Sequence, residues 1–458
     1  MFSLKFGGTS MGNSEAISQT AQIIISHPEP NKVVTVSAMS GVTNLLISAA
    51  NCATETNKIC YKNYLQEIQD KHLTALKKLV NNTDLYRTGE EFITKKISGL
   101  SGFLHALTII GEVSPRSNDE IVSLGEILSA KLLSLHLQDL GEKSDFINLE
   151  NIVSKMFDKD HTEANKEFFE CFAHKLEKLL TPLLEKNITP ICTGFFGKIP
   201  GGIVATVGRG YSDFTAALIG KACNAKEIQI WTDVNGILST DPRIVPEAHV
   251  IEELSFDEAT ELANLGAKVI HPQTIWPAVK NNILVRIKNT MSPLDAGTAI
   301  TKEGKLSTHS FKSITIQKDI TIITVRSTTM TESGVLGELF QEFANHKVSI
   351  DLVSTSESSI SVTIQNENKN KNLQQLITQL EKKFIVNREN NNTIIAIIGN
   401  EMRENIGVAG RFLSALSDHK INVRMISQGA NQSNISAVIS QKDSKNAVQA
   451  VHKKFFRI

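Results

Sequence analysis

The segment from Gly208 to Thr215 combines residue types that could bind an anionic substrate. It contains two glycines around Arg209, then Ser212 and Asp213, and the apolar run Ala216–Ile219 that follows is typical of a helix. A glycine-rich loop that opens a helix presents free backbone N–H groups and the positive end of the helix dipole to an anion. Arg209 adds a planar fork of donors that suits a carboxylate or a phosphate.

A second combination lies at the amino terminus. The short segment Ser3–Phe6 predicts a strand, and Gly7 and Gly8 follow it directly. Lys5, near the end of this strand, would place a cation beside backbone that can approach a phosphate closely. The G-x-x-x-x-G-K-[ST] spacing of a Walker loop is absent, so nucleotide chemistry at this point would belong to another fold.

Strands and helices must position these residues. Strand-like apolar runs alternate with helical patterns over about the first 300 residues. The predicted strands are Ser3–Phe6, Val33–Ser37, Ser144–Ile147, Thr189–Thr193, Glu227–Thr232 and Ile283–Lys288. This alternation favours an α/β fold with a mostly parallel sheet covered by helices. Between Cys52 and Ile110, Leu and Ile recur at helical spacing and predict a helical excursion.

The character of the chain changes near Ser307, where short β-rich runs begin and the sequence then repeats itself. Gly334–Gly337 begins one copy and Gly407–Gly410 begins the other. His346–Ile350 matches His419–Val423 at the same offset. Two copies form a pair of small α+β domains rather than a solenoid, which needs more copies. Two polar stretches are expected to be loops, 366–372 and 387–393.

Composition limits the class of protein. The 458 residues suggest about three domains, and equal numbers of basic and acidic residues give no general attraction to nucleic acid or to an anionic membrane. No apolar run is long enough to span a bilayer, and no secretory signal is visible. The five cysteines form no C-x-x-C pair, so we expect free thiols in a reducing, cytoplasmic environment.

Five motifs, in the same order along the chain, resemble the signatures of aspartate kinases. They are Lys5–Ser10, Val36–Leu46, Gly208–Asp213, Trp231–Gly236 with Asp241–Arg243, and Gly266–Pro272. The resemblance implies the amino-acid kinase fold over residues 1–300. It also implies two ACT-like domains, at 307–385 and 390–458, with the C-terminal end available to complete the first.

The resemblance also implies an activity, the ATP-dependent phosphorylation of the L-aspartate side chain to 4-phospho-L-aspartate. This is the first step toward lysine and diaminopimelate, threonine and methionine. A carboxylate is already a nucleophile at neutral pH, so positioning and cations would supply most of the catalysis. Mg²⁺ would accompany ATP and be held mainly through the phosphates, without a protein metal site. A homodimer or a larger assembly is expected.

The family's roles fall on residues that match its motifs. Lys5 and Asp213 would be catalytic, with Lys5 contacting the transferred phosphoryl group and Asp213 organising Lys5. Substrate contacts would come from Thr43, Glu126, Arg209 and Ser212. Within that set, Arg209 would hold the aspartate α-carboxylate and Glu126 its ammonium. Nucleotide contacts would come from Lys5, Gly7, Gly8, Ser37, Thr232, Asp233, Arg243 and Lys268. A feedback amino acid, lysine or alternatively threonine, would bind Val335, Leu336, Ser349, Asp351, Thr355, Ser356 and Glu357.

Other interpretations stay open from the residues alone. The chain could be another amino-acid kinase, acting on glutamate, acetylglutamate, carbamate or UMP, or an inert amino-acid sensor. Glu126 could be a partner for the positive end of a helix dipole. Asp233 and Arg243 could form a structural ion pair, and Trp231 and Trp276 are expected in the core.

Overall fold

The structure is a computed structural model that describes most of the chain. The described residues are 1–55, 60–154, 156, 166–199, 201–207, 210–266, 272–305, 311–326, 334–365, 371–429 and 433–456. They form two compact units. The first unit comprises Met1–Ile237, Glu252–Phe256 and Val269–Gly304, and the second comprises Leu238–Ile251, Asp257–Lys268 and Lys305–Ile458. No helix in the described ranges is long and apolar enough to cross a membrane.

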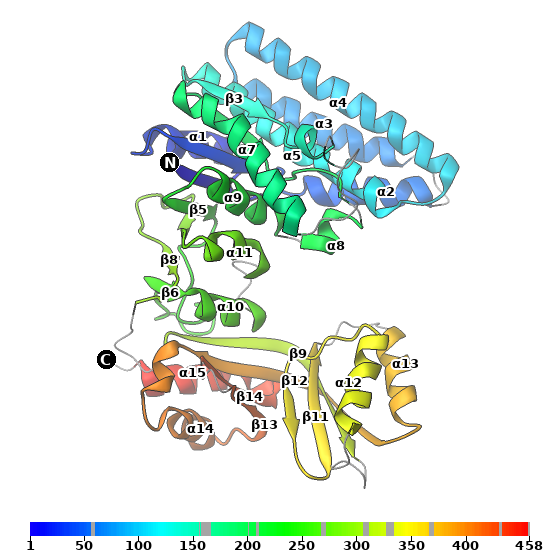
Figure 1. The fold of residues 1–458 in the computed structure, drawn as a ribbon, viewed down its shortest axis with the longest axis vertical. Coiled ribbons are helices and arrows are strands. Elements are labelled where there is room, and N and C mark those ends of the chain that lie inside the picture. The colour runs from blue at the N-terminus through cyan, green and yellow to red at the C-terminus, as the bar shows by residue number, and fades with distance from the viewer. Residues whose placement is uncertain are drawn as a thin grey trace. The chain divides into compact units, whose positions relative to one another are not determined.

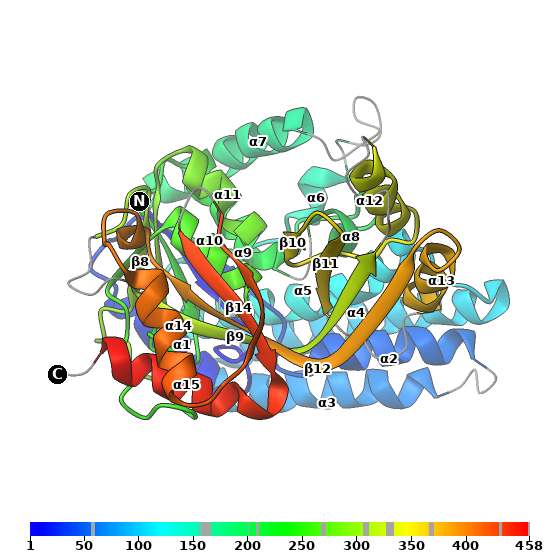
Figure 2. The same ribbon diagram turned by 90° about the horizontal axis from the view of Figure 1, so that it is seen from below.

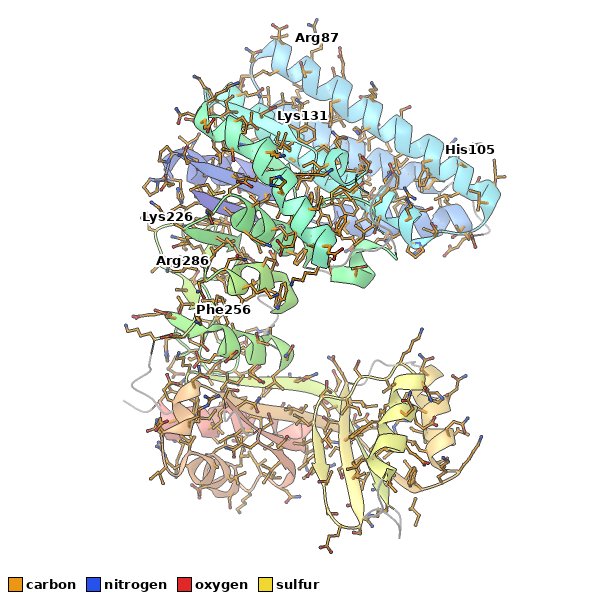
Figure 3. The ribbon with its side chains drawn as sticks, viewed as in Figure 1. Arg87, His105, Lys131, Lys226, Phe256 and Arg286 are labelled. Atoms are coloured by element: carbon orange, nitrogen blue, oxygen red, sulfur yellow. A yellow bond between two sulfur atoms is a disulfide. The ribbon has the colours of Figure 1, made fainter. Side chains whose placement is uncertain are left out.

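An eight-stranded sheet forms the centre of the first unit, with the order β3-β4-β2-β1-β5-β7-β8-β6 (Figure 1). Its strands are β1 (Phe2–Phe6), β2 (Lys32–Val36), β3 (Ser144–Ile147), β4 (Thr189–Thr193), β5 (Glu227–Thr232), β6 (Glu253–Ser255), β7 (Leu284–Asn289) and β8 (Thr298–Thr301). Neighbouring strands are parallel except β7 and β8. The six predicted strands are therefore confirmed, each to within one residue. Arg286 on β7 pairs with Glu227 on β5 at 2.8 Å (Figure 3).

Helices cover both faces of this sheet. One hydrophobic cluster packs α1 (Ser14–Ser26), α2 (Val42–Thr54), α3 (Tyr61–Leu79), α4 (Thr83–Ile110) and α5 (Pro115–Asp139) with strands β1 and β2. On the opposite face lie α7 (Lys166–Glu185), α9 (Tyr211–Ala222) and α11 (Pro272–Lys280). Two short helices, α6 (Glu150–Val153) and α8 (Ile203–Val207), lie in the connections. Cover on both sides leaves nearly every residue of β1 and β2 buried, including the polar residues Ser3, Lys5 and Thr35.

The second unit contains a six-stranded antiparallel sheet with the order β10-β11-β9-β12-β14-β13. Its strands are β9 (Ser313–Arg326), β10 (Val353–Thr355), β11 (Ser359–Gln365), β12 (Ile385–Ile398), β13 (Val423–Ser427) and β14 (Asn434–Ser440). Its helices are α10 (Phe256–Asn264), whose first residue belongs to the first unit, α12 (Val335–Asn345), α13 (Lys371–Leu380), α14 (Val408–Asp418) and α15 (Ser444–Phe455). Two 3₁₀ turns complete it, Asn400–Arg403 and Gln441–Asp443. Figure 2 shows β9 and β12 as long adjacent strands.

The sequence repeat gives a repeated structure. Gly334 and Gly407 both have a positive φ, 99° and 84°, and each directly precedes the first residue of a helix. Lys347 and Lys420 both adopt the left-handed conformation, with φ of 53° and 58°. The histidine before each lysine bonds through Nδ1 to the carbonyl oxygen four residues earlier. The shared helix ends support the expectation of a duplicated unit.

Two expectations from the sequence are wrong. Residues 387–393 were expected to form a loop, but they lie inside β12, where their backbone pairs with β9 and β14 across a bulge near Asn391. Cys52 and Cys60 were expected as free thiols, but they form a disulfide, because the end of α2 and the start of α3 bring their Cα atoms within 6.1 Å. Cys171, Cys192 and Cys223 are free.

Candidate active site

The carboxyl ends of four neighbouring strands bring functional groups to one edge of the first unit's sheet. Lys5 lies near the end of β1, Ser37 and Gly194 directly follow β2 and β4, and Thr232 ends β5. Backbone hydrogen bonds continue the sheet here, from the Ser37 N–H to the Phe6 carbonyl and from the Gly194 N–H to Val36, both 3.0 Å. Ligands of open parallel sheets bind outside this edge, which makes it the candidate active site.

The side chains of Lys5 and Asp213 form an ion pair across this edge. Lys5 Nζ lies 2.6 Å from Asp213 Oδ1, and the two side chains are only 10% and 12% exposed. Side chains alternate along a strand, so Lys5 shares a face with Ser3, whose hydroxyl donates to the Ala216 carbonyl of α9 at 2.9 Å. That face brings Lys5 to Asp213 in the first turn of α9. The sequence places these two partners 208 positions apart, and the fold brings them into contact.

The first turn of α9 is held against the ends of β2 and β4. The hydroxyl groups of Ser212 and Ser37 are 3.1 Å apart. Thr215 donates to the carbonyl of Gly194, and its hydroxyl oxygen lies 2.9 Å from the Tyr211 carbonyl oxygen. Gly210, at the start of α9, has no side chain to act as a cap. Among the described residues no partner is found for the N–H groups of Tyr211 and Ser212, which are therefore available to an anion.

Glu126 lies next to this pair and is almost completely buried, at 2% exposure. Burial raises the pKa of its carboxyl to about 8, although N–H groups of Phe195 and Ala38 and the charge of Lys5 act in the opposite direction. Asp213 raises this pKa further. Oε2 of Glu126 has no hydrogen-bond partner among the described residues. A buried carboxylate oxygen without a partner is suited to receive a cationic group.

The position of Glu126 also decides between its two interpretations. It lies in the middle of α5, which begins at Pro115, so the interpretation as a partner for the helix dipole is wrong. The dipole's effect is confined to the first turn of a helix.

Gly194 is a site residue that the sequence did not indicate. A Cβ atom at this position would lie 2.6 Å from Cβ of Ser212, 2.9 Å from the Val36 carbonyl oxygen and 3.1 Å from Glu126 Oε2. Such distances are too short for any side chain, so a glycine is required where β4 ends. A glycine directly after a predicted strand was the available signal.

Asp119 is a second residue that sequence reasoning missed. Both of its carboxylate oxygens accept the Ile203 N–H, at 3.2 and 3.0 Å, and the residue is 2% exposed. Burial raises its pKa to about 6, while N–H groups of Ile203 and Ile199 lower it. Asp119 thereby fixes the start of α8, the short helix that precedes the Gly208–Asp213 motif. Its burial in the fold, rather than its spacing, distinguishes it from other acids.

The other predicted contacts in the first unit lie at the same strand ends. Thr232 donates to Asp233 Oδ1 at 3.1 Å, and the Gly7 N–H donates to the Trp231 carbonyl at 3.0 Å. Gly8 lies near the Ala38 carbonyl, from which an added Cβ would be 3.3 Å. Thr43 occupies the first turn of α2. Their roles toward a nucleotide or substrate stay predictions.

Arg243 lies in the second unit and has a partner of its own. It binds Asp241 through Nε and Nη2, at 3.0 and 2.8 Å, and its side chain is 88% exposed. Asp241, rather than Asp233, is therefore the ion-pair partner that the structure gives to Arg243. Arg209 and Lys268 lie outside the described residues.

The residues predicted to bind a feedback amino acid lie on the first repeat of the second unit. Val335 and Leu336 start α12 directly after Gly334, which has no side-chain cap. Asp351 lies before β10 on an exposed part of the chain, and partial desolvation of its carboxyl raises its pKa to about 6, although a hydrogen bond with Gln317 lowers it. Thr355 ends β10 and is exposed, as are Ser349, Ser356 and Glu357.

The described residues contain no group of three or more His, Cys, Asp or Glu side chains that could hold a metal ion. The phosphates of a bound nucleotide are suitable ligands for a divalent cation.

Comparison with known proteins gives matches over nearly the whole chain. The model of the amino acid kinase family matches residues 4–289, and the ACT domain model matches residues 323–380 and 395–455. Chloroplastic aspartokinase 3 of Arabidopsis thaliana is 35% identical over 99% of this chain and 81% of its own length. The aspartokinase of Saccharomyces cerevisiae is 33% identical over 98% of this chain and 92% of its own.

Solved structures agree with these relatives. E. coli aspartokinase III in complex with aspartate and ADP matches with a TM-score of 0.80 and 29% identity, over all of both chains. The same enzyme in complex with lysine and aspartate matches with a TM-score of 0.79. With this fold, these strand ends and these relatives, the chain belongs to the aspartokinases, enzymes of the amino acid kinase family that carry ACT domains.

Proposed function

We propose that this chain transfers the γ-phosphoryl group of ATP to the side-chain carboxylate of L-aspartate, which gives 4-phospho-L-aspartate and ADP. The observation that carries the proposal is the pair Lys5–Asp213 beside the buried, unpartnered Oε2 of Glu126. Aspartate offers an ammonium group for that oxygen and a carboxylate as the nucleophile. The related E. coli enzyme in complex with aspartate and ADP supports the same pair of ligands.

Each group has a physical role in this proposal. Glu126 loses its proton when the substrate ammonium binds, and Arg209 holds the α-carboxylate. Lys5, kept in place by Asp213, neutralises charge that develops on the transferred group. The free N–H groups at the start of α9 add further donors. Mg²⁺ supplies charge neutralisation on the nucleotide phosphates.

The test is an assay that couples ADP release to a signal, with a panel of acceptors. We expect turnover with L-aspartate and little with glutamate, acetylglutamate, carbamate or UMP. Faster turnover with another acceptor would reassign the substrate. If every acceptor fails while ligands still bind, the chain is an inert sensor.

We also propose that lysine inhibits the enzyme by binding the first repeat. Directly after the matching segments His346–Ile350 and His419–Val423, the first repeat has Asp351 where the second has Arg424. Arg424 is paired with Glu389 of β12 at 2.6 Å, so the second repeat already contains its own cation. Asp351 instead offers a carboxylate to a ligand ammonium, and the uncapped start of α12 offers N–H groups to a ligand carboxylate.

Inhibition assays test this assignment. Lysine should inhibit, and Asp351→Ala should weaken inhibition while leaving the uninhibited kcat nearly unchanged. Glu381→Ala, an exposed change beyond α13, is the control. A lysine-bound structure of the E. coli relative supports the choice of ligand. A response to threonine alone would redirect the assignment, and indifference to millimolar lysine would reject it.

The proposal also covers the oligomeric state, the cellular compartment and the biosynthetic pathway. We propose a homodimer or larger assembly, formed through the first ACT-like repeats, in the cytoplasm, acting in lysine and diaminopimelate biosynthesis. Exposed sheet edges such as β10 are the surfaces that pair readily with another copy. Light scattering that finds a monomer at micromolar concentration would contradict this assembly.

A further inference from the structure

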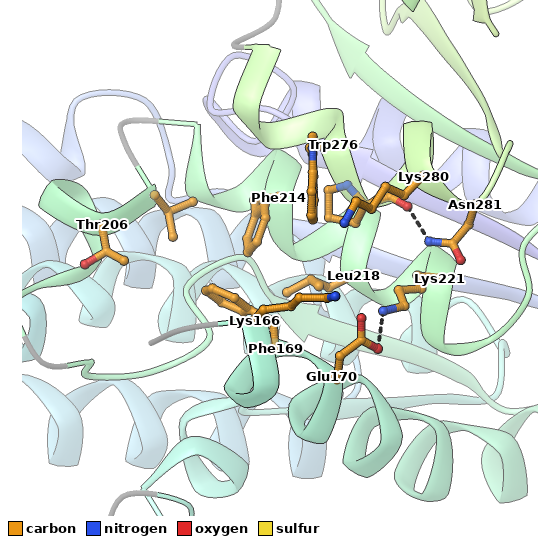
Figure 4. A pocket seen from close by; sticks show the side chains of 12 residues that line it. Lys166, Phe169, Glu170, Thr206, Phe214, Leu218, Lys221, Trp276, Lys280 and Asn281 are labelled. Atoms are coloured by element: carbon orange, nitrogen blue, oxygen red, sulfur yellow. Dashed lines mark hydrogen bonds and ion pairs between the residues drawn. The ribbon is translucent and has the colours of Figure 1, made fainter. Parts of the chain in front are cut away.

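The first unit contains a cavity that is separate from the candidate active site. It has a volume of about 440 Å³ and lies between α7 and α11, over the outer face of α9 (Figure 4). Its apolar wall consists of Phe169 from α7, Phe214 and Leu218 from α9, and Trp276 from α11. None of the residues predicted to contact aspartate or nucleotide lines it among the described residues.

Three lysines and one glutamate also line this cavity. Lys221 lies 2.5 Å from Glu170, and Lys221, Lys166 and Lys280 all lower the pKa of Glu170. Three ammonium groups therefore face one carboxylate, which leaves two positive charges without a counter-charge among the described lining residues. Figure 4 shows Lys221 joined to Glu170, with Lys166 beside them and Lys280 next to Trp276. An anionic ligand would complete the charge balance.

Trp276 makes this cavity unusual. An aromatic residue in this helical pattern was expected in the core, but 49% of the surface of Trp276 is exposed. Lys280 Nζ lies 3.7 Å from the centre of its indole ring. An exposed indole that already attracts a cation offers a face for a ligand ring and keeps that cation where a ligand anion would lie.

We propose that this cavity binds a small aromatic carboxylate. Its volume falls in the range typical of pockets for small molecules, and its lining combines apolar and aromatic walls with a few charged groups. The ligand ring packs against Phe169, Phe214 and Trp276. The ligand carboxylate binds the ammonium groups of Lys166 and Lys280, for which the described part of the chain provides no carboxylate beyond the shared Glu170.

The composition of the chain provides a direct assay. The chain has two tryptophans, and Trp231 is only 3% exposed, so a change of emission on ligand binding comes mainly from Trp276. We would titrate the full-length protein with 3-phenylpropionate, 3-phenylpropanamide and propionate, and repeat the titrations by calorimetry. We expect saturable quenching by 3-phenylpropionate at millimolar concentration or below, and binding at least about fivefold weaker for the uncharged amide and for the acid without a ring.

Variants separate this site from unspecific binding. Lys280→Gln and Lys166→Gln should each weaken 3-phenylpropionate about threefold to tenfold, and Lys178→Gln, an exposed change elsewhere on α7, should not. Trp276→Phe should abolish the quenching but leave calorimetric binding in place. The proposal is overturned if no saturation occurs up to about 10 mM. Equal binding of the amide also overturns it, as does Trp276 emission that depends on protein concentration without ligand, because a second copy would then cover the cavity.

Discussion

Replacing Glu126 with glutamine should stabilise the fold while weakening the binding of aspartate. In the folded protein, burial raises the pKa of Glu126 from its usual 4.5 to about 8. The folded state therefore holds a proton that the unfolded chain releases between these two values. For an acid with a raised pKa, stability falls as the pH rises through this window and is constant above it.

The size of the effect follows from this window. The interval from pH 4.5 to pH 7 corresponds to about 3 kcal/mol, at about 1.4 kcal/mol for each pH unit. Glutamine has nearly the same shape and no proton to lose. We therefore expect the free energy of unfolding of Glu126→Gln to exceed that of the unchanged protein by about 3 kcal/mol at pH 7, and by almost nothing near pH 4. Urea denaturation at several pH values measures the difference.

Kinetics should change in the opposite direction. Binding of the substrate ammonium requires Glu126 in its carboxylate form. With a pKa of about 8, about nine tenths of Glu126 is protonated at pH 7, which lowers the affinity for aspartate about tenfold. The KM for aspartate in the unchanged enzyme should therefore fall about tenfold between pH 7 and pH 9. In Glu126→Gln the KM for aspartate should be at least tenfold higher at pH 7, because the desolvated pair of carboxylate and substrate ammonium is lost. It should also no longer depend on pH in this range.

The free energy of unfolding and the KM for aspartate together test the role of Glu126. Glu91→Gln, an exposed change on α4, is the control and should alter neither. A Glu126→Gln protein that is less stable at pH 7 would contradict the assigned burial cost. An unchanged KM for aspartate would remove Glu126 from the substrate site. The KM for ATP should stay within about twofold, which separates loss of the ammonium contact from general damage to the site.

Substitutions at three other residues test the site. Lys5→Ala should lower kcat by at least about a hundredfold in protein that still folds, because a cation needed in the transition state is removed, although loss of one partner of a buried ion pair also lowers stability. Near-normal kcat would exclude Lys5. Gly194→Ala should destabilise the protein by about 1–3 kcal/mol and raise the KM for aspartate, since its Cβ would lie 2.6 Å from Ser212 Cβ; an unchanged Tm would argue against this packing. The unchanged protein should lose stability as the pH rises from about 4 to 6, and Asp119→Asn should remove this loss. Asp119→Ala should lower the free energy of unfolding by about 1–2 kcal/mol, because it leaves the Ile203 N–H unpaired. Equal pH profiles of stability for Asp119→Asn and the unchanged protein would exclude Asp119 as the titrating group.

The sequence predicted the central sheet well because its strands are short, mostly buried segments, and several are followed directly by glycine or a small polar residue, such as Gly7, Ser37 and Gly194. Ser144–Ile147, Thr189–Thr193 and Glu227–Thr232 have the predicted bounds. The failure at 387–393 has the opposite cause. Most of this part of β12 is exposed, so its residues are polar, and only the backbone ladder to β9 makes it a strand. Propensity does not detect a strand whose side chains are not buried.

The site was predictable only in part. Residue types and motif resemblance selected Lys5, Asp213 and Glu126, but no pattern in the sequence gives the burial that raises the Glu126 pKa or the close approach at Gly194. Those features depend on β1, β4, α5 and α9 meeting at one edge. The exposed position of Trp276 was missed for a similar reason, because an aromatic residue in a helical pattern is normally on the buried face.

The division of the chain into units links the nucleotide residues to the ACT repeats. The match to the amino acid kinase family continues to residue 289, yet Leu238–Ile251 and Asp257–Lys268 fold with the second unit. Within that unit, Lys312 at the start of β9 binds Glu258 of α10 at 2.8 Å, with both side chains at most 5% exposed. Removing one partner of such a buried pair costs several kcal/mol, so α10 is firmly fixed to the repeats. Arg243, a predicted nucleotide contact in the first of these segments, therefore belongs to the same compact unit as the proposed lysine site. Linkage then requires any lysine-induced change in nucleotide affinity to be matched by an equal effect of nucleotide on lysine.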